Sequence, residues 1–196
     1  MSGVPQRRLF FALVPGAEAR SALHALARQH APARARHVPA TDLHLTLLFL
    51  GNVPEPDLPR LCAAAAAIAA PPFAVVLDRL ERWRGGLLCA TGTAGPEALA
   101  LHQQLVQGVQ DAGFTVDTRP FRAHATLVRD LPRAAGRVDE PIEPVRLQVD
   151  SFCLMESREM ESRERAEGGR YSVLAQWRLD KVGDAAAQHE SGVILI

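Results

Sequence analysis

The chain has 196 residues, which is enough for one domain with a sizeable hydrophobic core. Its 22 basic residues balance 22 acidic ones, so the net charge is zero and no overall field draws it to nucleic acid or membrane. The apolar runs are too short to span a bilayer, and the N-terminal residues lack the pattern of a secretory signal, so we expect a cytoplasmic protein.

The first part of the chain alternates strands with helices. The apolar run "RLFFALV" predicts a strand over 8–14, and apolar residues at helical spacing predict a helix over 17–30. A second strand is expected over 44–50. A helix over 57–70 should follow, because an aspartate and a proline near its beginning suit a helix N-terminus.

The middle of the chain continues this alternation. Two strands are predicted over 73–80 and 86–93, joined across the turn "ERWRGG". The clearest helix is expected over 96–113, because it begins with proline and ends with a glycine where a C-terminal cap belongs. A strand over 121–129 comes next.

The last part of the chain predicts a hairpin between strands over 145–155 and 171–179. The charged, glycine-closed stretch between them is interpreted as a solvated loop. Residues 182–196 lack clear periodicity, so we expect them to form a disordered C-terminal tail. The remainder, 1–181, is interpreted as a single domain.

The order of these elements contains a weak internal repeat. A strand, a helix and a second strand over 8–50 match those over 86–129 in kind and in order. If the two copies form lobes that face each other across a groove, the last strands of the two copies should come together. This arrangement would explain an unusual motif that both of these strands carry.

Each repeat ends in a strand with a histidine and a threonine two positions apart. In "HLTLLFLG", strand alternation places His44 and Thr46 on one face. The opposite face is predicted to be apolar: Leu43, Leu45, Leu47 and Phe49. In "FRAHATLVR", His124 and Thr126 again share a face, together with Arg122. Each strand is therefore expected to pack the core on one side and to present an imidazole and a hydroxyl on the other.

The pairing of the motifs matters more than either motif alone. A single histidine in such a strand is more often a hydrogen-bonded structural residue than a functional one. The chain has seven histidines, and the other five lie outside this pattern. No acidic residue or cysteine stands near either motif with ligand-like spacing, so we expect no metal and no cofactor. The cysteines lack any paired spacing and are interpreted as reduced, buried thiols: Cys62, Cys89 and Cys153.

Two opposed histidines suit in-line displacement at phosphorus. Such a reaction needs a base on the attacking oxygen and an acid on the leaving oxygen. An unperturbed imidazole titrates near pH ~6.5, so one histidine can be neutral while its partner is charged. Threonine hydroxyls on the same face can donate hydrogen bonds to the non-bridging oxygens, where charge lies in the transition state.

The motif stretches "DLHLTLLFLG" and "FRAHATLVRD", with "RLFFAL" and "YSVLAQWRL" in the expected order, closely resemble the two-histidine (2H) phosphoesterases. The resemblance covers 7–180 and is greatest to the RNA 2′,3′-cyclic phosphodiesterases, historically called 2′-5′ RNA ligases. It implies an α+β fold that is bilobal and duplicated, with two mainly antiparallel sheets lining a central groove and helices on the outside.

The same resemblance implies metal-independent hydrolysis of an RNA terminal 2′,3′-cyclic phosphate to a 2′-phosphomonoester. It implies that His44 is the proton donor and His124 the proton acceptor, while Thr46 and Thr126 bind the phosphate. Arg129 matches an arginine that the family places after the second motif, where it can hold phosphate.

The position of this arginine conflicts with simple alternation. Strict alternation places Arg129 on the face opposite His124, so a bulge or the strand end must turn it inward. Arg122 is its rival by geometry.

Three classes of function stay open. The favoured one is a phosphodiesterase whose partner is an RNA or nucleotide end with a 2′,3′-cyclic phosphate. The second is another 2H enzyme, which acts on a small cyclic phosphate or nucleotide or joins RNA ends by reversible 2′-5′ ligation. The third, a non-catalytic nucleotide-binding module, is disfavoured because both motifs are intact. We expect a monomer that needs no protein partner.

Overall fold

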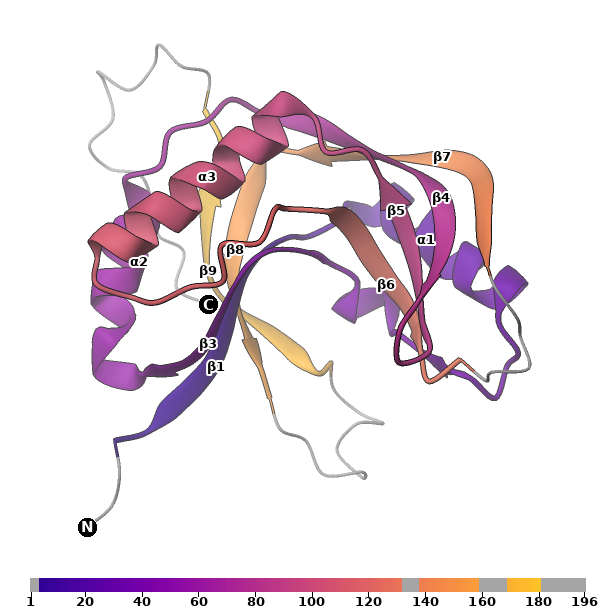
Figure 1. Ribbon diagram of the computed structural model, residues 1–196, viewed down its shortest axis with the longest axis horizontal. Coiled ribbons are helices and arrows are strands. Elements are labelled where there is room, and N and C mark those ends of the chain that lie inside the picture. The colour runs from indigo at the N-terminus through magenta and orange to yellow at the C-terminus, as the bar shows by residue number, and fades with distance from the viewer. Residues whose placement is uncertain (1–3, 132–137, 159–168, 181–196) are drawn as a thin grey trace.

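The computed structural model describes residues 4–131, 138–158 and 169–180 (Figure 1). Among these residues, nine strands form two sheets, and every strand pair is antiparallel. Three α-helices complete an α+β fold. The expected fold class is therefore confirmed. The predicted tail, 182–196, lies outside the described residues.

The first sheet, called sheet A, has the strand order β3-β1-β8-β9. Its strands are β1 (Gln6–Leu13), β3 (Leu45–Pro54), β8 (Ser151–Ser157) and β9 (Tyr171–Arg178). The first motif precedes and begins β3, so its polar residues lie on an edge strand of this sheet.

The second sheet, called sheet B, has the strand order β2-β6-β5-β4-β7. Its strands are β2 (Arg36–His37), β4 (Phe73–Trp83), β5 (Leu87–Gly92), β6 (Ala123–Arg129) and β7 (Asp139–Val149). The second motif lies in β6. The two copies of the repeat have the same pairing: β1 pairs with β3 in one sheet and β5 pairs with β6 in the other.

Two of the three α-helices contact the sheet opposite to the one whose strands they connect, and one of these two also touches its own sheet. They are α1 (Ala17–His30), α2 (Leu58–Ala66) and α3 (Pro96–Asp111), with short 3-10 turns at η1 (Ala40–Asp42) and η2 (Glu55–Asp57). Helix α1 connects β1 to β3 of sheet A but contacts β6 and β7 of sheet B. Helix α3 connects β5 to β6 of sheet B but contacts α2 and β3. Figure 1 shows α2 and α3 on one side of the molecule and α1 on the other.

The hydrophobic core is continuous across the two sheets. One cluster of buried side chains includes Phe11 and Leu45 from sheet A and Leu77 and Leu127 from sheet B. A separate, smaller apolar cluster on sheet A contains Phe10, with Ala12, Cys153 and Met155 around it. This smaller cluster lies on the face that carries His44, because the Phe10 and His44 ring centroids are 5.0 Å apart.

Two sequence-based predictions of element boundaries are corrected. The stretch predicted as one strand, 145–155, is divided at Asp150 between β7, which pairs with β4 in sheet B, and β8, which pairs with β1 and β9 in sheet A. Only β8 and β9 form the expected hairpin. The helix predicted over 57–70 ends at Ala66, because the chain turns there to enter β4.

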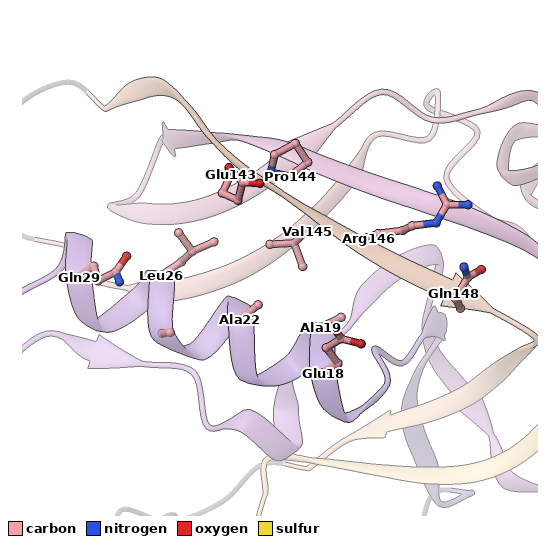
Figure 2. A pocket seen from close by; sticks show the side chains of 11 residues that line it. Glu18, Ala19, Ala22, Leu26, Gln29, Glu143, Pro144, Val145, Arg146 and Gln148 are labelled. Atoms are coloured by element: carbon pink, nitrogen blue, oxygen red, sulfur yellow. The ribbon is translucent and has the colours of Figure 1, made fainter.

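Two cavities lined by described residues lie away from His44, Thr46, His124 and Thr126. One of about 470 Å³ opens between α1 and the edge strand β7, with Ala19, Ala22 and Leu26 on one side and Val145 on the other (Figure 2). Neither motif contributes to its lining. Among the described residues, no helix is both long and apolar enough to cross a membrane.

Candidate functional site

Both motif strands contain a β-bulge at the same position. In the pairing of β3 with β1, Thr46 and Leu48 lie opposite two consecutive residues of β1. Leu47 between them therefore has no partner and is the extra residue of the bulge. In the pairing of β6 with β5, Thr126 and Val128 oppose consecutive residues, so Leu127 is extra. The extra residue follows the motif threonine in each case, so the duplication includes the irregularity as well as the regular elements.

The bulge reverses which face of the sheet the following residues occupy. Leu48 and Val128 are buried in the core, directly after the buried bulge residues. As a consequence, the fifth residue after each motif histidine returns to the motif face: Phe49 in β3 and Arg129 in β6. The predicted core position of Phe49 is therefore wrong, and this side chain is 40% exposed and lies opposite Phe10.

The first motif histidine is fixed by its backbone and by two aromatic rings. His44 is half-buried, and its Nδ1 lies 2.7 Å from the carbonyl oxygen of Asp42. A carbonyl only accepts, so Nδ1 carries the hydrogen and Nε2 is left for chemistry. The His44 ring centroid lies 4.7 Å from that of Tyr171 and 5.0 Å from that of Phe10.

The second motif histidine is held in a closely similar way. His124 is half-buried, and its Nδ1 donates to the carbonyl oxygen of Arg122 at 2.8 Å. The ring of Trp83, from β4, packs against it with a centroid distance of 4.5 Å. Both imidazoles therefore have the same tautomer, with Nε2 as the free nitrogen.

One arginine connects the two sheets at this site. Arg129, at the end of β6, donates from its guanidinium to the hydroxyl of Tyr171, in β9, at 3.0 Å. The ring of Tyr171 in turn contacts His44. The bulge thus brings Arg129 to the side of the site occupied by the first motif. Arg122 is directed elsewhere, since it pairs with Glu81 and lies over the ring of Trp83.

The electrostatic environment lowers the pKa of both histidines. For His44, burial is the main cause, the hydrogen bond to Asp42 opposes it, and the positive charges of Arg129 and His124 lower the pKa further. For His124, burial again lowers the pKa most, and nearby Glu81 raises it. The positive charge of His124 thus acts on His44, and the strands that carry the two motifs, β3 and β6, are in contact.

The motif threonines lie on the same faces as the histidines. Thr46 and Thr126 are both half-buried. The hydroxyl of Thr126 lies 3.9 Å from the thiol of Cys89, and burial raises the pKa of this thiol to about 11. Cys89 therefore stays protonated near neutral pH and cannot serve as a base or nucleophile. The three cysteines are free thiols as predicted, but Cys62 is only half-buried.

Several residues of the site have no recognisable signal in the sequence. Tyr171 and Trp83 come from strands remote from the motifs, and only the fold brings them to the histidines. Asp42 is buried and accepts a hydrogen bond from the backbone of Arg170 at 2.9 Å. Asp130 lies in a bend directly after β6, with φ of 57°.

The donor atoms at the site do not form a metal-binding group. Within the described ranges, no three histidine, cysteine, aspartate or glutamate side chains converge in a way that could hold a metal ion. The arrangement offers instead two imidazole nitrogens, two hydroxyls and one guanidinium. This set can bind an anion and transfer protons on two sides of it.

A sequence profile of the 2′-5′ RNA ligase superfamily matches residues 14–161. The chain belongs to this superfamily. Across 176 residues it is 32% identical to the RNA 2′,3′-cyclic phosphodiesterase of Escherichia coli K12, a match that covers 88% of this chain and 97% of the relative. It is 33% identical over 193 residues to the RNA 2′,3′-cyclic phosphodiesterase of Thermus thermophilus, covering 88% and 90%.

The fold agrees with solved structures of the 2′-5′ RNA ligase superfamily. The crystal structure of Escherichia coli LigT complexed with 3′-AMP matches with a TM-score of 0.76 at 30% identity, covering 90% of this chain and 100% of that one. A Thermus thermophilus structure, TT0787, matches with a TM-score of 0.71 at 30% identity, covering 88% and 97%. The family resemblance predicted from the two motifs is confirmed.

Proposed function

We propose that this superfamily member hydrolyses an RNA terminal 2′,3′-cyclic phosphate to a 2′-phosphomonoester, without a metal, by acid–base catalysis between two histidines. The observation that carries the proposal is the paired imidazole arrangement. Both His44 and His124 donate Nδ1–H to a backbone carbonyl, so both leave Nε2 free for proton transfer. The RNA 2′,3′-cyclic phosphodiesterases that match over most of the chain support the choice of substrate.

The reaction is an in-line displacement at phosphorus. His124, in its neutral form, accepts a proton from water through Nε2 as the water oxygen bonds to phosphorus. His44, in its protonated form, donates a proton from Nε2 to the ribose O3′ as the bond from phosphorus to O3′ breaks. The product keeps its phosphate on O2′. Each histidine should contribute roughly 10²–10⁴-fold to the rate.

The non-bridging phosphate oxygens are bound by Thr46, Thr126 and Arg129. The two hydroxyls can donate hydrogen bonds from the motif faces. The guanidinium of Arg129 is preferred over that of Arg122 because it contacts Tyr171 beside His44, whereas Arg122 pairs with Glu81. A guanidinium is well suited to a phosphate because its fork of donors matches the oxygen geometry.

Product analysis tests this proposal. The purified protein should convert 2′,3′-cyclic AMP and an oligoribonucleotide with a cyclic end to 2′-phosphomonoesters, identified by phosphorus NMR. The rate should be unchanged by EDTA. Replacing either His44 or His124 with alanine should lower kcat by roughly 10²-fold or more. His24→Ala, on α1, is the matched control and should leave the rate unchanged.

Each alternative result has a defined meaning. A 3′-phosphate as the major product would reverse the acid and base roles of the two histidines. Loss of the rate on chelation, restored by a divalent cation, would contradict metal independence. If only small cyclic phosphates other than RNA ends were hydrolysed, the chain would be a different kind of 2H enzyme.

A further inference from the structure

A carboxylate lies at the centre of a hydrogen-bonded cluster beside His124. The indole nitrogen of Trp83 donates to Oε2 of Glu81 at 2.6 Å, and the hydroxyl of Thr91 donates to Oε1 at 3.0 Å. The guanidinium of Arg122 donates to Oε2 at 3.2 Å. We call these four residues the Glu81 cluster.

The Glu81 cluster surrounds the imidazole of His124 on the face that carries the second motif. The guanidinium of Arg122 lies 4.7 Å from the ring centroid of Trp83, and that ring lies 4.5 Å from the ring of His124. Thr91 is buried and lies directly opposite His124 in the pairing of β5 with β6. The carboxylate of Glu81 therefore holds both Trp83 and Arg122 in place beside the imidazole of His124.

We propose that Glu81 is a positioning residue for His124, which holds Trp83 and Arg122 in place so that the imidazole presents Nε2 in one orientation. The proposal extends the function proposed above, since it assigns a supporting role to a residue outside both motifs. Glu81 does not itself contact the reacting atoms; it acts through the ring of Trp83 and the strand that carries Arg122.

The chemistry assigned to His124 explains why a carboxylate belongs at this place. A base becomes positively charged when it accepts the proton from water, and a nearby negative charge stabilises that imidazolium. Arg122 alone would oppose this step, because its own positive charge lies next to His124. The ion pair between Arg122 and Glu81 offsets that charge.

The carboxylate near the first motif histidine is placed differently: Asp42 raises the pKa of His44, but it accepts from the backbone of Arg170 and not from an aromatic neighbour of the histidine. His44 is flanked by the rings of Phe10 and Tyr171, and the hydroxyl of Tyr171 accepts from a guanidinium. Both histidines thus donate Nδ1–H to a backbone carbonyl. The aromatic neighbour of His124, Trp83, is held by a carboxylate, whereas the aromatic neighbour of His44, Tyr171, is held by an arginine. This difference fits one histidine that gains positive charge and one that loses it.

The charged and titratable groups that face His124 come from several elements. They are Arg122 from its own chain segment, Glu81 from β4 and His44 from the first motif. Of these, Glu81 raises the pKa of His124, whereas Arg122 lowers it. Removing the charge of Glu81 should therefore lower the pKa of His124.

Glu81→Gln tests the proposal because it keeps the shape of the side chain and removes its charge. The imidazole of His124 is titrated by NMR in the free protein, and kcat is measured with 2′,3′-cyclic AMP. We expect the pKa of His124 to fall and kcat to fall roughly 10- to 100-fold, with little change in KM. Trp83→Phe keeps a ring but loses the indole donor, so it should lower kcat with a smaller effect on the pKa.

The matched control is Asp139→Asn, which removes a carboxylate paired with Arg79 on the neighbouring strand. Asp139→Asn should change kcat and the pKa of His124 much less than Glu81→Gln does. If Glu81→Gln folds, as judged by circular dichroism, and leaves both the His124 titration and kcat unchanged, the positioning role is wrong. If Glu81→Gln does not fold, unchanged values in Trp83→Phe overturn the proposal instead. A wild-type protein without hydrolytic activity would contradict the proposed function, while the NMR titration would still test the positioning role.

Discussion

At the scale of single residues, the proposed mechanism requires two identical side chains to perform opposite proton transfers. The backbone fixes both His44 and His124 in the same tautomer, so the tautomer does not distinguish them. Their surroundings do, because Arg129 beside His44 donates to the neutral hydroxyl of Tyr171, whereas Arg122 beside His124 is paired with Glu81. A bound phosphate would neutralise the effect of Arg129 on His44 and so favour the protonated form that an acid requires.

The pH dependence of the reaction should reflect these surroundings. Because burial lowers the pKa of both histidines below about 6.5, the bell-shaped profile of kcat/KM should have its alkaline limb below this pH. The anionic substrate raises the pKa of the acid, so the alkaline limb of kcat should lie at higher pH. Steady-state rates with 2′,3′-cyclic AMP between pH 4 and 9 measure the alkaline limbs of kcat/KM and of kcat. A limb of kcat/KM above pH 7 would contradict the lowered pKa values.

The residues to which we assign the chemistry were accessible from the sequence because they form a repeated local pattern. Spacing alone placed His44, Thr46, His124 and Thr126 on polar strand faces, and the structure agrees. Glu81 was not accessible in this way. Of its partners, Thr91 lies in β5 and Arg122 directly before β6, and contacts with both depend on sheet register, which no local spacing encodes.

At the scale of elements, the β-bulges decide which side chains reach the site. The sequence contains no recognisable signal for an extra residue at Leu47 or Leu127, since both are ordinary strand residues. Strict alternation therefore predicted a core position for Phe49 and left Arg129 unexplained. The division at Asp150 was missed for a similar reason, because two strands of different sheets follow each other with one residue between them.

A close approach between strands makes Gly92 a sensitive position. A Cβ atom at Gly92 would collide with the carbonyl oxygen of Val76, in β4. Gly92→Ala should therefore lower the free energy of unfolding by about 1–3 kcal/mol or more. Urea unfolding measures this change. Gly108→Ala is the control, since its Cβ would be at an ordinary 3.5 Å from the nearest atom and the substitution should stabilise α3 by roughly 0.5–1 kcal/mol. Equal stability of the two variants would contradict the crowding at Gly92.

At the scale of the whole molecule, the exchanged helices couple the two sheets. Because α1 follows β1 of sheet A but packs on sheet B, unfolding one sheet exposes apolar surface of the other. The continuous core has the same effect. The protein should therefore unfold in one cooperative step in spite of its two lobes.

The two tryptophans allow a direct measurement of this coupling. Trp83 lies in sheet B and Trp177 in sheet A. Trp177→Phe leaves a reporter for sheet B, and Trp83→Phe leaves one for sheet A. Within each variant, the fluorescence transition in urea should coincide with the transition seen by circular dichroism. Separate midpoints in either variant would show that the lobes unfold independently.

Consider a half-length chain with a single strand–helix–strand unit. Its helix would pack on the sheet of another copy, so it could not cover its own sheet. Two identical copies would have to exchange helices, and a two-fold axis would then relate their motif strands. In such a homodimer every position occurs twice, so both histidines would have the same neighbours. Joining the copies into one chain removes that constraint. Equivalent positions can then differ, as Phe49 and Arg129 do, and a symmetric pair of bases becomes a donor and an acceptor.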